Sequence, residues 1–483
     1  MPRLRCVIVL GILLIGVSAF SQTLKAGAAK SVITPKLGDK PIYLAGFGHD
    51  RAATGVHDDL YIRCLALADK SSTLVLCSAD LIGLFYGDVQ KIRALFDASA
   101  PAHSWLIVTC THVHSGPDTL GLWGPSPTQS GANPEYLDFV EHHIAATAID
   151  AVHNLRSAQL EFARDDHPLL EQLQSVDRPP FVHDPYLFAL RAVDASSGST
   201  IATLVNWSDH PEILGRSNHE ISADYAHSLC ESIESHDGGV ALFFNGTVGK
   251  VSALGSDVAI QDSATGALAP DGGARKAELF GTLIAQLAER SLKTAQRASI
   301  DHISVAHLTV FVPLENDRFR MAIAAGVFGD RRPLYTGGKP DPTVETRDAP
   351  QVGNVPFPLG HDIQTEVDFV QLSSDGHAIA EIATVPAEIY PELTNGGIAR
   401  YLGADFPDAP FEPAIRPHFR TRYQFVFGVA NDELGYLIPK AEWDAEAPFL
   451  QNRASPWYGE INSLGPNAAA AVLNAITNLM RTR

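Results

Sequence analysis

Short apolar runs typical of β-strands alternate with helical patterns along almost the whole chain, and this alternation most restricts its fold. The strand-like runs are rich in β-branched and apolar residues and cover 73–78, 105–111, 201–206, 309–314 and 366–372. Helical patterns begin near Asp88 and after Asn133-Pro134, and two more cover 275–292 and about 466–480. No segment repeats at a fixed period, and no low-complexity linker divides the chain. The pattern therefore predicts one large α/β domain.

The N-terminus has the pattern of an export signal. Arg3 and Arg5 precede an apolar run over 6–17, after which small residues follow. A run of about a dozen residues is short for a membrane span, which needs about 20. We therefore expect a cleavable signal peptide over 1–21, a mature domain over 22–483, no integral membrane anchor, and a secreted or periplasmic protein. An uncleaved anchor is the alternative.

Composition limits the partners of the chain. With 36 Lys and Arg against 55 Asp and Glu, the formal net charge of −19 disfavours binding to nucleic-acid phosphates. A hydrophobic content of 45% with 19% charged residues excludes a disordered protein. No cysteine pair has metal-clip spacing. Four cysteines would remain after signal cleavage, which allows one or two disulfides: Cys64, Cys77, Cys110 and Cys230.

Two histidines directly follow a predicted strand, in the sequence THVHSGP over 111–117. Side chains alternate along an extended chain, so we expect His112 and His114 to point to the same side. Two imidazoles presented together can bind zinc, or one can bind while the other transfers protons. A pair of solvated loop histidines is the alternative.

Three further polar segments leave apolar runs. His210 is held before a proline at a strand exit, and Glu388 lies between two prolines as a candidate oxygen ligand or a surface residue. The glycine-containing segment 243–252 could expose backbone N–H groups and a hydroxyl to an oxyanion, or form an ordinary turn. Tyr436 follows another strand-like run, and nothing local distinguishes it from a packing residue.

Taken in order, these segments resemble the catalytic domain of the neutral/alkaline, non-lysosomal ceramidases. The THVHSGP segment is close to the THTHSGP signature of that family, and the resemblance covers the chain from about residue 25 to its end. The other matching segments are AGAAKSVITP (26–35), AGFG (45–48), TGVHDDLY (54–61), the His-Pro pair at 210–211, 249–252, PAE (386–388) and 431–436.

The resemblance implies a large single catalytic domain with mixed β-sheets flanked by helices. It also implies one zinc ion, held by His112, His210, Glu388 and Tyr436, that activates water to cleave the amide of ceramide. Neutral imidazoles with hard oxygen ligands and one open position suit catalytic zinc. His114 would lie beside this water and transfer protons. The implied partner is a ceramide-like lipid amide, reached by interfacial contact with a membrane.

Three more site residues match the family by motif. Arg178 would bind a substrate oxygen, Ser252 matches the serine of the GDVSPN loop, and Tyr458 matches a site tyrosine near the C-terminus.

The sequence also departs from the family. Lys250 replaces the Asp of the GDVSPN loop, and Ala253 and Leu254 replace its Pro-Asn. The immunoglobulin-like C-terminal domain of full-length ceramidases is expected to be missing. These differences leave two alternatives to ceramide hydrolysis: a zinc hydrolase of another amide or ester, and a non-catalytic binding protein on the same scaffold. Acyl-chain preference and oligomeric state have no signal in the sequence.

Overall fold

The computed structural model describes residues 24–255, 257–341 and 361–482. The predicted signal peptide over 1–21 lies outside these residues. Among the described residues, no helix has both the length and the apolar character needed to cross a membrane.

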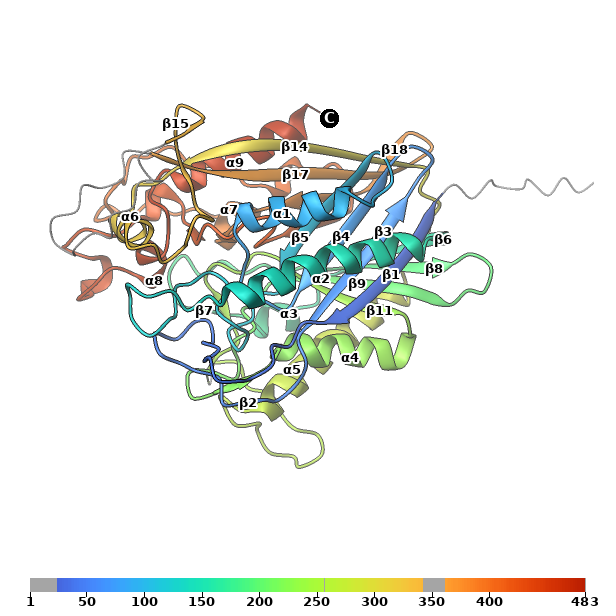
Figure 1. Cartoon of the computed structure of the whole chain (residues 1–483), viewed down its shortest axis with the longest axis horizontal. Helices are drawn as coiled ribbons and strands as arrows, with labels where there is room; N and C mark the ends of the chain where they lie inside the picture. Colours follow the sequence, from blue (N-terminus) through green and yellow to red (C-terminus); the bar gives the residue numbers. More distant parts are fainter. Residues whose placement is uncertain (1–23, 256, 342–360, 483) are drawn as a thin grey trace, which may run out of the picture.

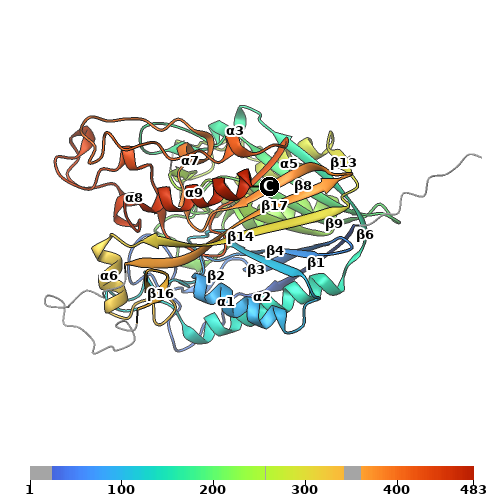
Figure 2. The ribbon, with the colours of Figure 1, turned by 90° about the horizontal axis from the view of Figure 1, so that it is seen from above.

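A nine-stranded mixed sheet forms the centre of the domain (Figures 1 and 2). β4 and β5 pair in parallel, as do β9 and β11, whereas the remaining pairs are antiparallel. Along the sheet the strands are β11 (Val240–Asn245), β9 (Thr200–Trp207), β8 (Leu187–Asp194), β6 (Arg156–Asp165), β1 (Lys25–Val32), β3 (Tyr61–Ala68), β4 (Thr73–Ala79) and β5 (Ser104–Cys110), with β13 (Gln296–Ala298) on β6.

A second, six-stranded sheet packs against the first. Its long strands β14 and β17 pair antiparallel, and β18 pairs in parallel with β20. The strands are β16 (Lys339–Pro340), β15 (Leu334–Thr336), β17 (Asp362–Ser374), β18 (His377–Thr384) and β20 (Tyr423–Phe427), with β14 (His302–Pro313) on β17.

The large sheet curls, so that both of its halves and the second sheet face one central core. Leu76 from β4, Phe162 from β6, Phe244 from β11 and Phe425 from β20 belong to the same buried cluster. Because strands from opposite ends of the large sheet meet in this cluster, their loops can meet at one end of the core.

Helices cover the outer faces of both sheets. α1 (Tyr86–Asp97) packs on β5 and α2 (Pro134–His153) on β1, β3 and β4. α4 (Tyr225–Asp237) packs on β11 and α5 (Ala274–Leu292) on β6 and β8, while α9 (Ala468–Arg481) packs on β14 and β17. α2 begins as its sequence predicts, because the Asn133 side chain accepts hydrogen bonds from two backbone N–H groups of the first turn. The predicted α/β class with mixed sheets flanked by helices is confirmed.

Cys64 and Cys77, opposite each other on β3 and β4, form a disulfide. Cys110 and Cys230 are buried and free. The chain therefore has one disulfide among the described residues, one of the two outcomes that the sequence left open.

Candidate metal centre and cavity

The segments that leave five strands meet at one end of the core. The Cys110 N–H at the end of β5 donates to the Val429 carbonyl beyond β20, at 3.2 Å. The Asn245 amide at the end of β11 donates to the Thr111 carbonyl at 3.1 Å. The His210 N–H beyond β9 donates to the Val251 carbonyl at 3.2 Å. The Val429 N–H donates in turn to the Ala387 carbonyl beyond β18, at 3.3 Å. These bonds bring the polar segments after β5, β9, β11, β18 and β20 to a single site.

His112 reaches this site through a turn. β5 ends at Cys110, and His112 has a φ of +68°, the left-handed region that side chains rarely adopt. Its N–H donates to the Leu81 carbonyl at 3.0 Å, and its ring Nδ1 donates to the Ile82 carbonyl at 2.7 Å. The two rings do lie together, as expected. The reason differs, because a turn at His112 brings them together and not the alternation of an extended chain.

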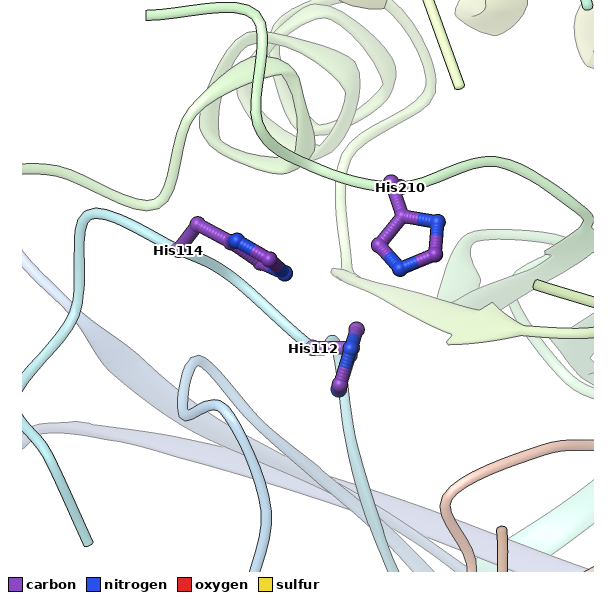
Figure 3. A group of neighbouring side chains, drawn as sticks. All are labelled: His112, His114 and His210. Atoms are coloured by element: carbon purple, nitrogen blue, oxygen red, sulfur yellow. The ribbon is translucent and has the colours of Figure 1, made fainter. Parts of the chain in front are cut away.

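Three imidazoles converge at this point (Figure 3). Ligand nitrogens of His112, His114 and His210 lie within 4.8 Å of one another, and all three side chains are buried. Such a group could hold a metal ion. Neither the strand pattern nor the spacing in the sequence predicts that His210 joins the other two histidines, because His210 follows β9, in the far half of the curled sheet.

Glu388 faces two of these rings. Its Oε2 lies 3.0 Å from His210 Nε2 and 3.4 Å from His112 Nε2. The Nδ1 atoms of both rings donate to backbone carbonyls, that of His210 to Val251 at 2.8 Å, so their Nε2 atoms point to the carboxylate. In the neutral tautomer, two nitrogen lone pairs and a carboxylate would then face one another.

Such a set of lone pairs requires a cation or bound protons. Burial alone would lower the pKa of His210, but Glu388 raises it to about 9. Burial would raise the pKa of Glu388, but the facing histidines hold it well below its usual range. Ring nitrogens fixed by Nδ1–H bonds to carbonyls, beside a carboxylate, are the arrangement that metal-binding histidines use. The donor set therefore fits a metal ion.

Tyr436 completes the group of four residues that the family motifs indicate as ligands. β19 (Glu388–Ile389) pairs in parallel with β21 (Tyr436–Leu437), which places Tyr436 directly beside Glu388. Burial and the neighbouring carboxylate, which hydrogen-bonds to it, raise the pKa of the Tyr436 hydroxyl well above its usual range. The hydroxyl therefore keeps its proton unless a cation displaces it.

His114 lies on the other side of the cluster. Its Nδ1 is 3.5 Å from Glu212 Oε2, and neither ring nitrogen makes a hydrogen bond with a described residue. Burial, followed by the neighbouring imidazoles, lowers the pKa of His114 well below its usual value. Gly46 makes room for this ring, because a Cβ there would lie 2.3 Å from His114 Nδ1. His114 is thus a neutral base with free ring nitrogens.

A cavity of about 600 Å³ opens beside the histidines. Ser252 lines it and donates a 2.6 Å hydrogen bond to Glu212 Oε1. Tyr458 is 55% exposed and also lines the cavity, with its ring edge-on to Tyr436 at 5.9 Å. The three residues that the family motifs place around the metal (Arg178, Ser252 and Tyr458) therefore share one cavity with His114 and His210.

Arg178 lies deep in the cavity wall and is 2% exposed. Its Nη1 contacts both carboxylate oxygens of Glu460, at 2.8 and 2.9 Å, and its Nη2 donates to the Glu442 carbonyl at 2.9 Å. Its Nε has no hydrogen-bond partner among the described residues. These bonds hold the Arg178 guanidinium in a fixed position in the cavity wall, with its Nε buried.

A smaller, largely apolar hollow of about 30 Å³ shares Tyr436 and Tyr458 with this cavity, and His112 and Glu388 also line it. Glu433 lines it beside Glu388, and burial raises the pKa of Glu433 well above its usual value, as does the Glu388 charge. The apolar wall of this hollow consists of Phe85, Leu120, Leu122, Trp123 and Phe319.

The sequence reasoning missed two features of the site. Glu212 contacts both His114 and Ser252, and its only signal was its place directly after the His-Pro pair. Lys250, noted only as a departure from the family, forms a buried ion pair with Glu392 in the cavity wall. All three contacts join residues that are far apart in the sequence.

Comparisons with known proteins identify the fold. No protein-family model matches the chain, and no curated protein sequence matches it. The structure is similar to the crystal structure of neutral ceramidase from Pseudomonas aeruginosa, with a TM-score of 0.64 and 16% identity over 95% of this chain and 74% of that one. A structure of a ceramidase complexed with C2 is equally similar, over 96% and 76%. The chain therefore has the neutral ceramidase fold, as the motifs indicated.

Proposed function

We propose that the protein is an exported, zinc-dependent hydrolase that cleaves the amide of ceramide or a related N-acyl lipid to a fatty acid and an amine. The observation that carries this proposal is the convergence of the His112 and His210 Nε2 atoms on Glu388, with Tyr436 beside it. The fold shared with ceramidases supports the amide as the target.

The four residues would hold the metal, and the others would serve the substrate. Bound zinc would lower the pKa of a water and polarise the amide carbonyl. His114 is neutral, and its ring nitrogens make no hydrogen bond with any described residue. One of them could therefore accept a proton and deliver it to the leaving amine nitrogen. Ser252, whose hydroxyl would turn from Glu212 to the substrate, and the Arg178 guanidinium would offset charge on the carbonyl oxygen, where one donor is worth about 3–4 kcal/mol.

The charged cavity favours a second candidate function, hydrolysis of a different amide or ester. Besides Arg178 and Lys250, the cavity wall contains Asp177, Arg216 and Asp257. The apolar hollow is small by comparison, and among residues 313–341 only Phe319 lines it. Residues 342–360 lie outside the described part of the chain.

A hydrolysis assay tests the proposal. Purified protein is loaded with zinc, and release of fatty acid from short- and long-chain ceramides is measured for the wild type, His112→Ala and His142→Ala. His142 is an exposed histidine on α2 and serves as the matched control. We expect release by the wild type and His142→Ala, and a loss of at least about 1000-fold in His112→Ala.

The possible results separate the three functions. Release from ceramide that depends on His112 supports the first proposal. Zinc binding with release only from other amides or esters supports the second. A protein that binds no zinc and releases nothing contradicts both and leaves a binding protein on this scaffold.

A further inference from the structure

Arg216 provides an unpaired positive charge at the wall of the cavity. It lies on the segment between β9 and α4, is exposed to solvent, and makes no ion pair with any residue that the structure describes. Its guanidinium extends over Gly48, where a Cβ would lie 3.9 Å from Nη1. Gly48 and Phe47 line the same part of the cavity, so a ligand there can reach the guanidinium directly.

A second, buried guanidinium, that of Arg51, adds to the positive charge near Arg216. Arg51 is 5% exposed, and its guanidinium lies over the Phe47 ring, 5.1 Å from the ring centroid. Its hydrogen bonds go to main-chain carbonyls, and it has no carboxylate partner among the described residues. Burial, followed by repulsion from Arg216, lowers the pKa of Arg51 to about 10, so Arg51 remains charged at neutral pH. The carbonyls that accept its hydrogen bonds belong to Ala45, His114, Gly215 and Asn218.

The acidic residues of the cavity contact side chains other than Arg51 and Arg216. Glu212 accepts the hydrogen bond of Ser252, and Asp257 accepts one from Ser175 at 3.2 Å. Burial raises the pKa of Asp177, and the charge of Arg178 opposes that rise. None of these carboxylates pairs with Arg51 or Arg216, so the corner formed by Phe47, Gly48, Arg51 and Arg216, here called the cationic corner, contains two guanidinium groups without an ion-pair partner among the described residues.

We propose that the cationic corner binds an anionic group on the amine half of the substrate. This inference rests on the proposed function. His114, which would deliver a proton to the leaving amine, lines the same cavity, and its backbone carbonyl accepts a hydrogen bond from Arg51. The amine half of a bound amide therefore extends toward Arg216.

A guanidinium recognises carboxylate, sulfonate and phosphate groups through paired hydrogen bonds. The substrate class is thus an N-acyl compound whose amine carries one of these anionic groups. An uncharged amine half, such as that of plain ceramide, leaves the Arg216 charge unused.

The test compares N-octanoylglycine with its methyl ester, which differ in one negative charge, below their micellar concentrations at constant ionic strength. kcat/KM for amide hydrolysis is measured with the zinc-loaded wild type, Arg216→Gln, Arg216→Lys and Arg422→Gln. Arg422 is an exposed arginine at the opposite end of β20 from the site and controls for the loss of one surface charge. N-octanoyltaurine and N-octanoyl-O-phosphoethanolamine extend the comparison to sulfonate and phosphate.

We expect the wild type and Arg422→Gln to prefer the acid over the ester about tenfold, Arg216→Gln to lose this preference, and Arg216→Lys to keep part of it. Equal rates for acid and ester in the wild type, or a preference that survives in Arg216→Gln, would overturn the inference.

A binding measurement keeps the inference distinct from the proposed function. Calorimetric titration of the same two compounds into wild-type and Arg216→Gln protein, stripped of metal by a chelator, excludes binding of the carboxylate to zinc. Binding that favours the acid, and that Arg216→Gln removes, supports the cationic corner whether or not the amide is hydrolysed. The absence of hydrolysis would overturn only the proposed function. Binding without selectivity overturns the inference and leaves the hydrolase unaffected.

Discussion

The buried ion pair between Lys250 and Glu392 allows a quantitative test of what stabilises the cavity wall. The Lys250 side chain is 1% exposed, and its Nζ contacts the Glu392 carboxylate and donates to the Pro180 carbonyl at 2.6 Å. It also lies 3.5 Å from the Arg178 carbonyl. Lys250 therefore links the Glu392 segment to the backbone that presents Arg178.

Removing one member of a buried pair leaves the other charge without compensation. Such a change costs about 3–5 kcal/mol, whereas removing both members costs much less than the sum. We expect Lys250→Met and Glu392→Gln each to lower the free energy of unfolding by about 3 kcal/mol or more. The double variant should lose less than the two together, with a coupling energy of at least about 2 kcal/mol.

Urea titration followed by circular dichroism measures these free energies, and the hydrolysis rate of each variant reports on Arg178. We expect Lys250→Met to lower kcat/KM, because the Arg178 backbone loses its anchor. A Lys250→Ala change would add a cavity, so Met, which keeps most of the volume, is the sharper variant. Additive losses in the double variant, or single losses below about 1 kcal/mol, would refute this reasoning.

Three further predictions concern the site and its surroundings. Tyr436→Phe removes the hydroxyl from the candidate ligand set, and zinc affinity measured against a competing chelator should weaken about 10–100-fold. Gly46→Ala places a Cβ 2.3 Å from His114 at a φ of +74°, so hydrolysis should fall about tenfold or more, whereas Gly38→Ala, with no atom within 4 Å, should leave the rate unchanged. Burial and then a neighbouring carboxylate raise the pKa of Glu442 to about 9, so the contribution of Glu442 to stability falls as the pH rises from about 4.5 to 9. Glu442→Gln should reduce this fall by up to about 1.4 kcal/mol per pH unit, measured by urea titration at several pH values; parallel curves would contradict the assignment.

Local signals allowed the elements of the fold to be predicted. The cap at Asn133 and the apolar periodicity that follows depend only on neighbouring residues, and α2 begins where they indicate. The curl of the nine-stranded sheet depends on packing between distant strands, which no local pattern reports. The Cys64–Cys77 pairing also required the register of β3 and β4, which the sequence left open.

The site could be predicted in its residues and only partly in its geometry. Family motifs placed His112, His210 and Glu388 in one centre, and their side chains do converge. The left-handed backbone of His112 has no sequence signal, because positive φ values at non-glycine residues depend on the surrounding structure. The charge of Arg216 likewise has meaning only beside the cavity that it lines.

The central claim is that His112, His210, Glu388 and Tyr436 hold a zinc ion needed for amide hydrolysis. The most direct measurement is zinc content per chain by mass spectrometry, with ceramide hydrolysis followed in the same samples as zinc is removed and restored. We predict one zinc per chain, loss of hydrolysis in proportion to zinc removed, and recovery on reloading. Full hydrolysis by zinc-free protein, or a chain that takes up no zinc, would contradict it.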